Sequence, residues 1–321
     1  MKRRPTSAQS KDRGSVRRVA GFVAVVLASL GSIPGQASAA TANTKARVIT
    51  AVGAESEYAN VLSQIGGKYV VVSSILNNPN TDPHAYEVTT SVAEEVSRAL
   101  LIVQNGVGYD SFMNRIEAAS PNSRRKLIVV QKVLGLPANT PNPHLWYDPK
   151  TMPKVAKAMA KDLGELDPGQ TSYFQDNLRT FDTSLQSWTK AIATFKSKYP
   201  GTKVAVTEPV ADYLLKAMGM RILTPFAFQA DIMNGVDPAP EDITLEDSFF
   251  TQHEAKVFCY NQQVVDSLTS SIRHTAIKNN VPVVGVYETM PTPRYDYQTW
   301  MLAEVKAIEA AVAHHRSTEK P

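Results

Sequence analysis

Short apolar runs rich in β-branched residues alternate with stretches of helical periodicity along most of the chain. Such runs predict strands, because β-branched side chains fit a pleated, buried surface. The predicted strands are 47–52, 69–76, 100–104, 126–130, 203–207, 221–223, 256–260 and 281–287. The predicted helices are 55–65, 91–98, 109–118, 149–166, 209–218, 240–251, 264–278 and 296–313. This alternation indicates an α/β fold with parallel sheets flanked by helices.

The segment 167–200 interrupts this alternation with one long amphipathic pattern. Its large apolar residues recur at spacings of four and three, which places them on one stripe of a single helix. They are Phe174, Leu178, Phe181, Leu185, Trp188, Ile192 and Phe195. At 1.5 Å per residue the helix would be about 45 Å long, enough to run along two lobes.

We therefore expect an N-terminal α/β lobe at 40–166, a long connecting helix at 167–200 and a C-terminal α/β lobe at 201–321. A coiled-coil dimer seam is the alternative use of such a stripe. Its many aromatic residues, and its position between two α/β halves, favour packing against the chain's own lobes. The prediction is therefore a monomer.

The first 39 residues have the pattern of a secretory signal peptide. Seven basic residues precede an apolar stretch at 19–33, which is too short for a comfortable membrane span. Ala37-Ser38-Ala39 then fits the small-residue rule of a cleavage site, which favours cleavage over an uncleaved anchor. No cysteine directly follows the apolar stretch to carry a lipid. We expect a freely soluble periplasmic protein, with Sec and Tat as alternative export routes.

The charge balance changes once this leader is set aside. The whole chain has 34 basic and 30 acidic residues. Residues 1–39 hold seven of the basic residues and one acid, so the remainder has 27 basic and 29 acidic residues and a net charge of −2. Nucleic-acid binding therefore loses its electrostatic support. The single cysteine, Cys259, lies in an apolar run and can form no disulfide within the chain.

Two Pro-His pairs lie in loops between strand-like and helix-like segments. His84 follows Pro83, and His144 follows Pro143 in a near-copy of the same context. Each proline stiffens the loop that presents its imidazole. Taken singly, each is more simply a solvated loop histidine. Two in matching contexts predict a metal site, since neutral imidazole is a common ligand of divalent transition ions.

Two glutamates could complete such a site from the second half of the chain. Glu208 directly follows the strand-like run 203–207, and Glu288 directly follows 281–287. Either alone could be a helix-capping or solvated acid. Ligands of open α/β sheets bind beyond the carboxyl ends of the strands, where both of these carboxylates are expected. Two histidines and two glutamates would then surround a divalent cation and balance its charge.

Three motifs carry a specific resemblance. They are DPHAYE at 82–87, QNGVG at 104–108 and NPHLWYDP at 142–149. Together with the single long helix between two lobes, they resemble the zinc- and manganese-binding solute receptors of bacterial metal ABC transporters. The resemblance covers nearly all of the chain after the leader.

The resemblance implies four ligands, which by motif are His84, His144, Glu208 and Glu288. Relatives usually have aspartate where Glu288 stands, so Asp296 is an alternative for the fourth position. The loop 131–143 also lacks the histidines and acids that often mark the zinc-specific branch. Two imidazoles and two carboxylates form a harder donor set than three imidazoles, and this points toward manganese or ferrous iron. Most such sites nevertheless bind zinc more tightly than manganese, which leaves the cargo open between Mn²⁺ and Zn²⁺, with Fe²⁺ as a third option.

The implied function is capture of a divalent cation between two lobes and its delivery to the membrane permease of an ABC transporter, without catalysis. A secreted metallohydrolase is the alternative, because it also needs a histidine–carboxylate metal site. That alternative lacks an HExxH motif in this sequence, and four protein ligands would leave little room for a reactive water. A surface adhesin is a third option that no feature of the sequence favours.

Overall fold

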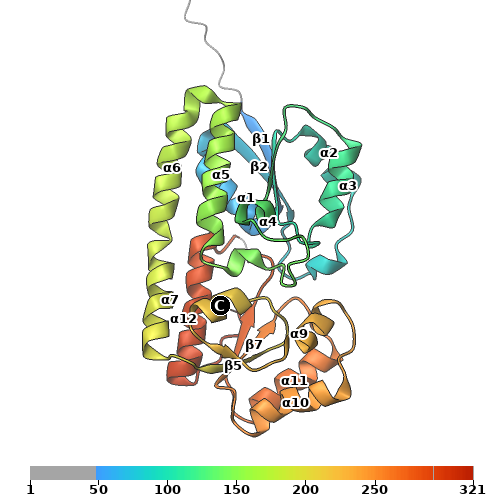
Figure 1. Ribbon diagram of the computed structural model, residues 1–321, viewed down its shortest axis with the longest axis vertical. Coiled ribbons are helices and arrows are strands. Elements are labelled where there is room, and N and C mark those ends of the chain that lie inside the picture. Colours follow the sequence, from blue (N-terminus) through green and yellow to red (C-terminus); the bar gives the residue numbers. More distant parts are fainter. Residues whose placement is uncertain (1–47, 292, 321) are drawn as a thin grey trace, which may run out of the picture. The chain divides into compact units, whose positions relative to one another are not determined.

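The computed structural model describes residues 48–291 and 293–320. The predicted signal peptide at 1–39 lies outside these residues. The described chain contains two sheets, each of four parallel strands, with helices packed around them (Figure 1). The predicted α/β class is therefore confirmed.

The first sheet has the strand order β2-β1-β3-β4. Its strands are β1 (Ile49–Glu55), β2 (Val70–Leu76), β3 (Leu101–Gln104) and β4 (Lys126–Val129). Every pairing is parallel, so helices must carry the chain back between strands. The helices of this half are α1 (Ser56–Gly66), α2 (Thr90–Arg98), α3 (Ser111–Ala119), α4 (Val130–Leu134) and α5 (Thr151–Leu166). These elements make up what we call the N-terminal lobe.

The second sheet repeats this arrangement with the order β6-β5-β7-β8. Its strands are β5 (Lys203–Val206), β6 (Arg221–Ile222), β7 (Val257–Asn261) and β8 (Val283–Val286). The helices of this C-terminal lobe are α8 (Asp212–Ala217), α9 (Phe226–Met233), α10 (Pro240–Thr251), α11 (Ser267–Lys278) and α12 (Tyr297–His314). Counted in chain order within each sheet, the second strand forms one edge of the sheet and the fourth strand forms the other.

All eight predicted strands are present, whereas two short helices were not predicted. The five-residue helix α4 is too short to show a helical period. The helix α9 has apolar residues on most sides and no clear polar face, so its pattern does not differ from that of a buried strand. Both omissions follow from the absence of an amphipathic signal.

The predicted connecting helix is present as two helices, α6 (Thr171–Ser184) and α7 (Gln186–Lys198), which meet at Leu185. The backbone of Leu185 keeps a right-handed helical conformation, and Figure 1 shows α7 continuing in the direction of α6. The Ser184 hydroxyl donates to the Phe181 carbonyl, which also accepts the N–H of Leu185. Such competition by serine and threonine hydroxyls weakens a helix locally, which accounts for the interruption.

The apolar stripe of this connector packs against both halves of the chain. All seven of its predicted residues are buried. Helix α6 contacts α1 and α5 of the N-terminal lobe, and α7 contacts α12 of the C-terminal lobe. Phe181 and Trp188 hold the ring of Tyr297 at the start of α12, with centroid distances of 6.5 and 5.9 Å. The connector therefore restrains both lobes over its whole length. None of the described helices is long and apolar enough for a membrane crossing.

Candidate metal centre

The candidate centre forms where loops after strands of the first sheet meet strand ends of the second. His84 lies in a loop that follows β2, in the short 3₁₀ helix Pro83–Ala85, and His144 lies in the loop between α4 and α5. Glu208 follows the end of β5, and Glu288 follows the end of β8. Parallel strands place their carboxyl ends along one edge of a sheet, so two acids distant in sequence become neighbours.

His84 is held by its own loop and by the opposite lobe. Its backbone N–H donates to Asp82 Oδ1 at 2.8 Å, which fixes the turn. Gln263 Nε2 of the C-terminal lobe donates to the Thr81 carbonyl at 2.7 Å. The imidazole Nε2 then lies 3.2 Å from Glu288 Oε2, with 28% of the side chain exposed. This histidine is the solvent-accessible side of the centre.

His144 is fully buried, and Asn142 fixes its orientation. Asn142 Oδ1 accepts the His144 backbone N–H at 2.9 Å and lies 2.9 Å from its Nδ1. The amide Nδ2 of Asn142 donates to the Pro209 carbonyl of the C-terminal lobe at 2.7 Å. With a proton on Nδ1, the lone pair of Nε2 is the one available to a cation. That Nε2 lies 3.1 Å from Glu288 Oε2.

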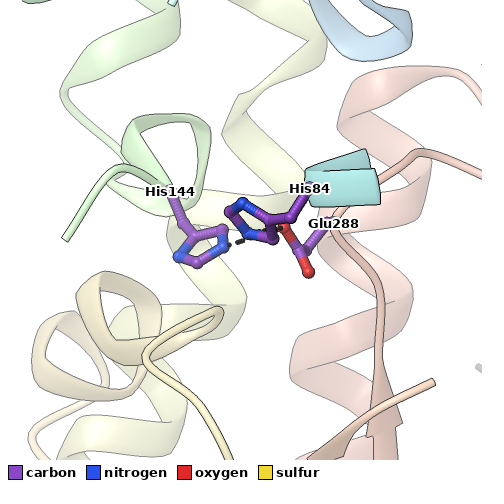
Figure 2. A group of neighbouring side chains, drawn as sticks. All are labelled: His84, His144 and Glu288. Carbon is purple, nitrogen blue, oxygen red and sulfur yellow. Dashed lines mark hydrogen bonds and ion pairs between the residues drawn. The ribbon is translucent and has the colours of Figure 1, made fainter. Parts of the chain in front are cut away.

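Glu288 is the point on which the other groups converge (Figure 2). Its Oε2 contacts the Nε2 atoms of His84 and His144 and accepts a hydrogen bond from the Tyr109 hydroxyl at 3.0 Å. Its Oε1 accepts from Asn261 Nδ2 at 2.6 Å. Burial alone would raise the pKa of Glu288, but the hydrogen bonds from the two histidines outweigh burial and lower it. The carboxylate is therefore ionised.

The ligand atoms of His84, His144 and Glu288 lie within 4.8 Å of one another, a spacing that one ion can span. Glu208 lies beside this group and not within it. Its side chain is 2% exposed, and its Oε1 accepts from the same amide nitrogen of Asn261 at 3.2 Å. Its Oε2 is buried and has no hydrogen-bond partner among the described residues.

Glu208 has the opposite protonation tendency from Glu288. Burial raises the pKa of Glu208, and the negative charge of Glu288 raises it further. A buried carboxyl oxygen without a partner is costly, and such atoms are rare in native proteins unless something else binds them. A divalent cation would satisfy this oxygen and remove the repulsion between the two acids.

Asp296, the alternative to Glu288, lies outside the centre. It stands directly before α12 with its side chain exposed, and its Oδ1 accepts a hydrogen bond from Asn60 Nδ2 at 3.0 Å. The hydrogen-bond partner of this carboxylate is therefore an amide of α1 and not a residue of the centre. Of the two, only Glu288 lies beside the histidines.

Two polar residues of the centre were not predicted. Tyr109 was assigned to a helix, yet it lies before α3 in a loop where Gly106, Val107 and Gly108 all have positive φ. A positive φ at a β-branched residue such as Val107 is rare and marks a constrained loop. The Tyr109 ring packs edge-on against the imidazoles of His84 and His144, with centroid distances of 5.2 and 5.9 Å.

Asn261 is the second of these residues. It is the last residue of β7 and is 1% exposed. A polar side chain at the end of a buried strand is the same signal that pointed to Glu208 and Glu288. The same signal in the sequence therefore marks Asn261 when amides are considered together with ionisable groups.

Comparison with known proteins places the chain in a family. The model of a family described as zinc-uptake complex component A, periplasmic, matches residues 52–311. The chain belongs to this family. The resemblance indicated by the three sequence motifs is therefore confirmed.

Individual relatives share about a quarter of their aligned residues with this chain. The metal ABC transporter substrate-binding lipoprotein SloC of Streptococcus mutans is 26% identical over 226 residues, which cover 66% of this chain and 72% of SloC. The manganese ABC transporter substrate-binding lipoprotein PsaA of Streptococcus anginosus is 24% identical over 237 residues, which cover 70% of this chain and 75% of PsaA. Both relatives are named as substrate-binding components of metal ABC transporters, and neither is named as an enzyme.

Solved structures of the same type share the fold. The periplasmic zinc-binding protein TroA of Treponema pallidum superimposes with a TM-score of 0.70 at 18% identity, covering 84% of this chain and 99% of TroA. At this identity the likeness establishes the fold alone. The ligands of this chain must therefore be argued from its own residues.

Proposed function

We propose that the protein captures a divalent transition-metal cation through His84, His144, Glu208 and Glu288 and delivers it to the membrane permease of an ABC transporter. The observation that carries this proposal is the convergence of two imidazole Nε2 atoms on one buried carboxylate oxygen. Family membership supports the role in transport. Mn²⁺ and Zn²⁺ are the cargoes named for relatives, in PsaA and TroA.

The electrostatics of the centre favour a divalent ion. Without a cation, hydrogen bonds from two histidines stabilise the charge of Glu288, and burial favours the protonated form of Glu208. A bound ion would take the histidine lone pairs and the carboxylate oxygens directly. The two negative charges would then balance the two positive charges of the ion, which removes the cost of burying either alone.

The centre joins the lobes, which suits a receptor that senses its cargo. His84 and His144 come from loops of the first half, and the two glutamates come from strand ends of the second. We take 40–166 and 201–321 as the two lobes and 167–200 as their connector. The connector packs against helices of both lobes, so we propose that it limits the lobes to small movements and that binding tightens the contact between them without a wide hinge closure.

We further propose that the protein acts as a periplasmic monomer without enzymatic activity. Hydrolysis at a metal centre needs an open coordination position for water. Three converging side chains, with Glu208 as a fourth ligand, would enclose the ion on most sides. A screen of ester, amide and phosphate substrates with the metal-loaded protein should show no turnover above that of the free ion.

Metal titration of the ligand variants tests the proposed site. Isothermal titration of chelator-stripped protein with Zn²⁺, Mn²⁺ and Fe²⁺ should show one ion bound per chain. His84→Ala and His144→Ala should each weaken binding about 100-fold or more, since a lost ligand in a buried charged site costs about 3 kcal/mol or more. His274→Ala serves as the control, because His274 is exposed on α11. Unchanged affinity in either ligand variant would remove that residue from the site.

A further inference from the structure

One amide joins the two carboxylates of the candidate centre. Asn261 Nδ2 donates to Glu288 Oε1 at 2.6 Å and to Glu208 Oε1 at 3.2 Å. A primary amide has two N–H groups, so each carboxylate takes one. All three residues are buried, with 1–2% of their surface exposed. The bridge therefore lies in a dry environment, where its hydrogen bonds are strong.

The orientation of this amide is fixed from its other side. Asn261 Oδ1 accepts the backbone N–H of Gln263 at 3.0 Å, and the Asn261 backbone N–H donates to Thr207 Oγ1 at 3.0 Å. The carbonyl oxygen of the Gln263 side chain accepts the backbone N–H groups of Glu288 and Thr289, both at 2.8 Å. Asn261 thus belongs to a rigid network at the ends of β5, β7 and β8, and a flip of its amide would break several bonds.

This bridge leaves one oxygen of each carboxylate for a cation. Glu288 Oε2 faces the two imidazoles, and Glu208 Oε2 is buried without a partner among the described residues. A carboxylate that chelates one ion turns both of its oxygens toward that ion. Chelation by either glutamate would require Oε1 to turn from Asn261 toward the ion, which weakens its hydrogen bond with the buried amide and is therefore unfavourable.

We infer that Asn261 restricts both glutamates to a single metal–oxygen bond and thereby sets a centre of four donors, two nitrogens and two oxygens, that prefers Zn²⁺ to Mn²⁺. Zn²⁺ is stable with four ligands in a tetrahedron, whereas Mn²⁺ is typical of octahedral oxygen-rich sites. The inference rests on the proposed function, and it adds a restriction on the coordination number to the general preference of such donors for Zn²⁺. Asn261 touches no cargo itself and acts by positioning the two carboxylates.

The coordination number can be read directly with Co²⁺ as a probe. Four-coordinate Co²⁺ absorbs visible light intensely, whereas five- and six-coordinate Co²⁺ absorb weakly. Chelator-stripped wild-type protein titrated with Co²⁺ should give the intense bands. Weak bands at full occupancy would overturn the inference while leaving metal capture intact. No binding of Co²⁺, Zn²⁺ or Mn²⁺ would instead refute the proposed function, and the inference with it.

The role of Asn261 is tested by removing its amide. In Asn261→Ala both glutamates are free to chelate, so the visible bands of Co²⁺ should weaken. The ratio of the Mn²⁺ to the Zn²⁺ dissociation constant should fall about tenfold or more, the scale of losing a residue that orients metal ligands. An unchanged spectrum and ratio would overturn the role of Asn261.

Two further variants keep the test decisive. Asn60→Ala is the matched control, because Asn60 Nδ2 donates to the exposed carboxylate of Asp296 at 3.0 Å, outside the centre. It should change neither the spectrum nor the ratio, and a change as large as that of Asn261→Ala would refute a specific role. Asn261→Leu keeps a similar side-chain volume but lacks the N–H donor and any group that could bind the cation. If Asn261→Ala does not fold, Asn261→Leu must show the same weakening of the Co²⁺ bands, and intense bands would overturn the inference.

Discussion

Replacement of Glu288 by glutamine would change the charge of the centre with almost no change in shape. Glu288 Oε2 contacts three donors, namely the Nε2 atoms of two histidines and the Tyr109 hydroxyl. A glutamine amide can offer this cluster only a neutral oxygen or an N–H group that would oppose the donors. The variant therefore loses the anionic ligand, and it weakens the hydrogen bonds that the two histidines and Tyr109 make to this position.

The size of the loss follows from burial. The Glu288 side chain is fully buried, so water cannot replace the missing charge. Removing one partner of a buried charged interaction costs about 3–5 kcal/mol. At about 1.4 kcal/mol per factor of ten, this predicts a Zn²⁺ dissociation constant roughly 100- to 4,000-fold higher in Glu288→Gln.

Competition against a chromophoric chelator at pH 7.5 measures this change, and Asp296→Asn is the control. Asp296 is exposed and accepts a hydrogen bond from Asn60, so its variant should bind within about threefold of wild type, the range of a surface change. Tight binding by Glu288→Gln together with a large loss in Asp296→Asn would show that Asp296, and not Glu288, binds the cation.

The remaining predictions concern protons. Burial of His84 favours its neutral form, but the hydrogen bond and charge of Glu288 outweigh burial and raise the pKa of His84. Because a cation needs the neutral imidazole, affinity for Zn²⁺ should fall as pH drops from 8 to 5, by up to about tenfold per pH unit for each proton displaced; a flat profile in titrations across this range would show that the histidines are not ligands. Burial also raises the pKa of Glu304, within α12, to about 8. The folded state therefore keeps a proton that the unfolded chain loses above about pH 4.5, so stability should fall between pH 4.5 and 8 by up to about 1.4 kcal/mol per pH unit. Urea unfolding of metal-free Glu304→Gln should lack this part of the decline, whereas the exposed-site control Glu241→Gln should keep it; equal slopes in Glu304→Gln and wild type would contradict the burial argument.

Local patterns were enough to predict the sheets and to single out two histidines that the structure brings together with Glu288. Short runs of β-branched residues predicted the strands. Both histidines follow a proline in a loop between a strand-like and a helix-like segment, and this repetition singled them out. Glu288 could be proposed from the sequence because it directly follows a buried apolar run, where an unpaired carboxylate is costly to bury. The sequence does not decide between Glu288 and Asp296 as the fourth ligand. That choice depends on which carboxylate the folded C-terminal lobe turns toward the histidines.

The residues that sequence reasoning missed act through tertiary contacts. Tyr109 reaches Glu288 across 179 positions of sequence, and its loop departs from the helical pattern that predicted it. Asn261 joins two carboxylates that come from different strands. No local pattern encodes such convergence. The interruption at Leu185 was likewise hidden, because the apolar stripe continues through it without a change of spacing.

A crystal of the protein loaded with Zn²⁺, measured on both sides of the zinc absorption edge, would show which side chains bind the ion. We expect one strong anomalous peak per chain, bonded to the Nε2 atoms of His84 and His144 and to one oxygen each of Glu208 and Glu288, at about 2.0–2.2 Å. A strong peak elsewhere, or a peak at this centre without Glu288 among its ligands, would show that the proposed ligand set is wrong.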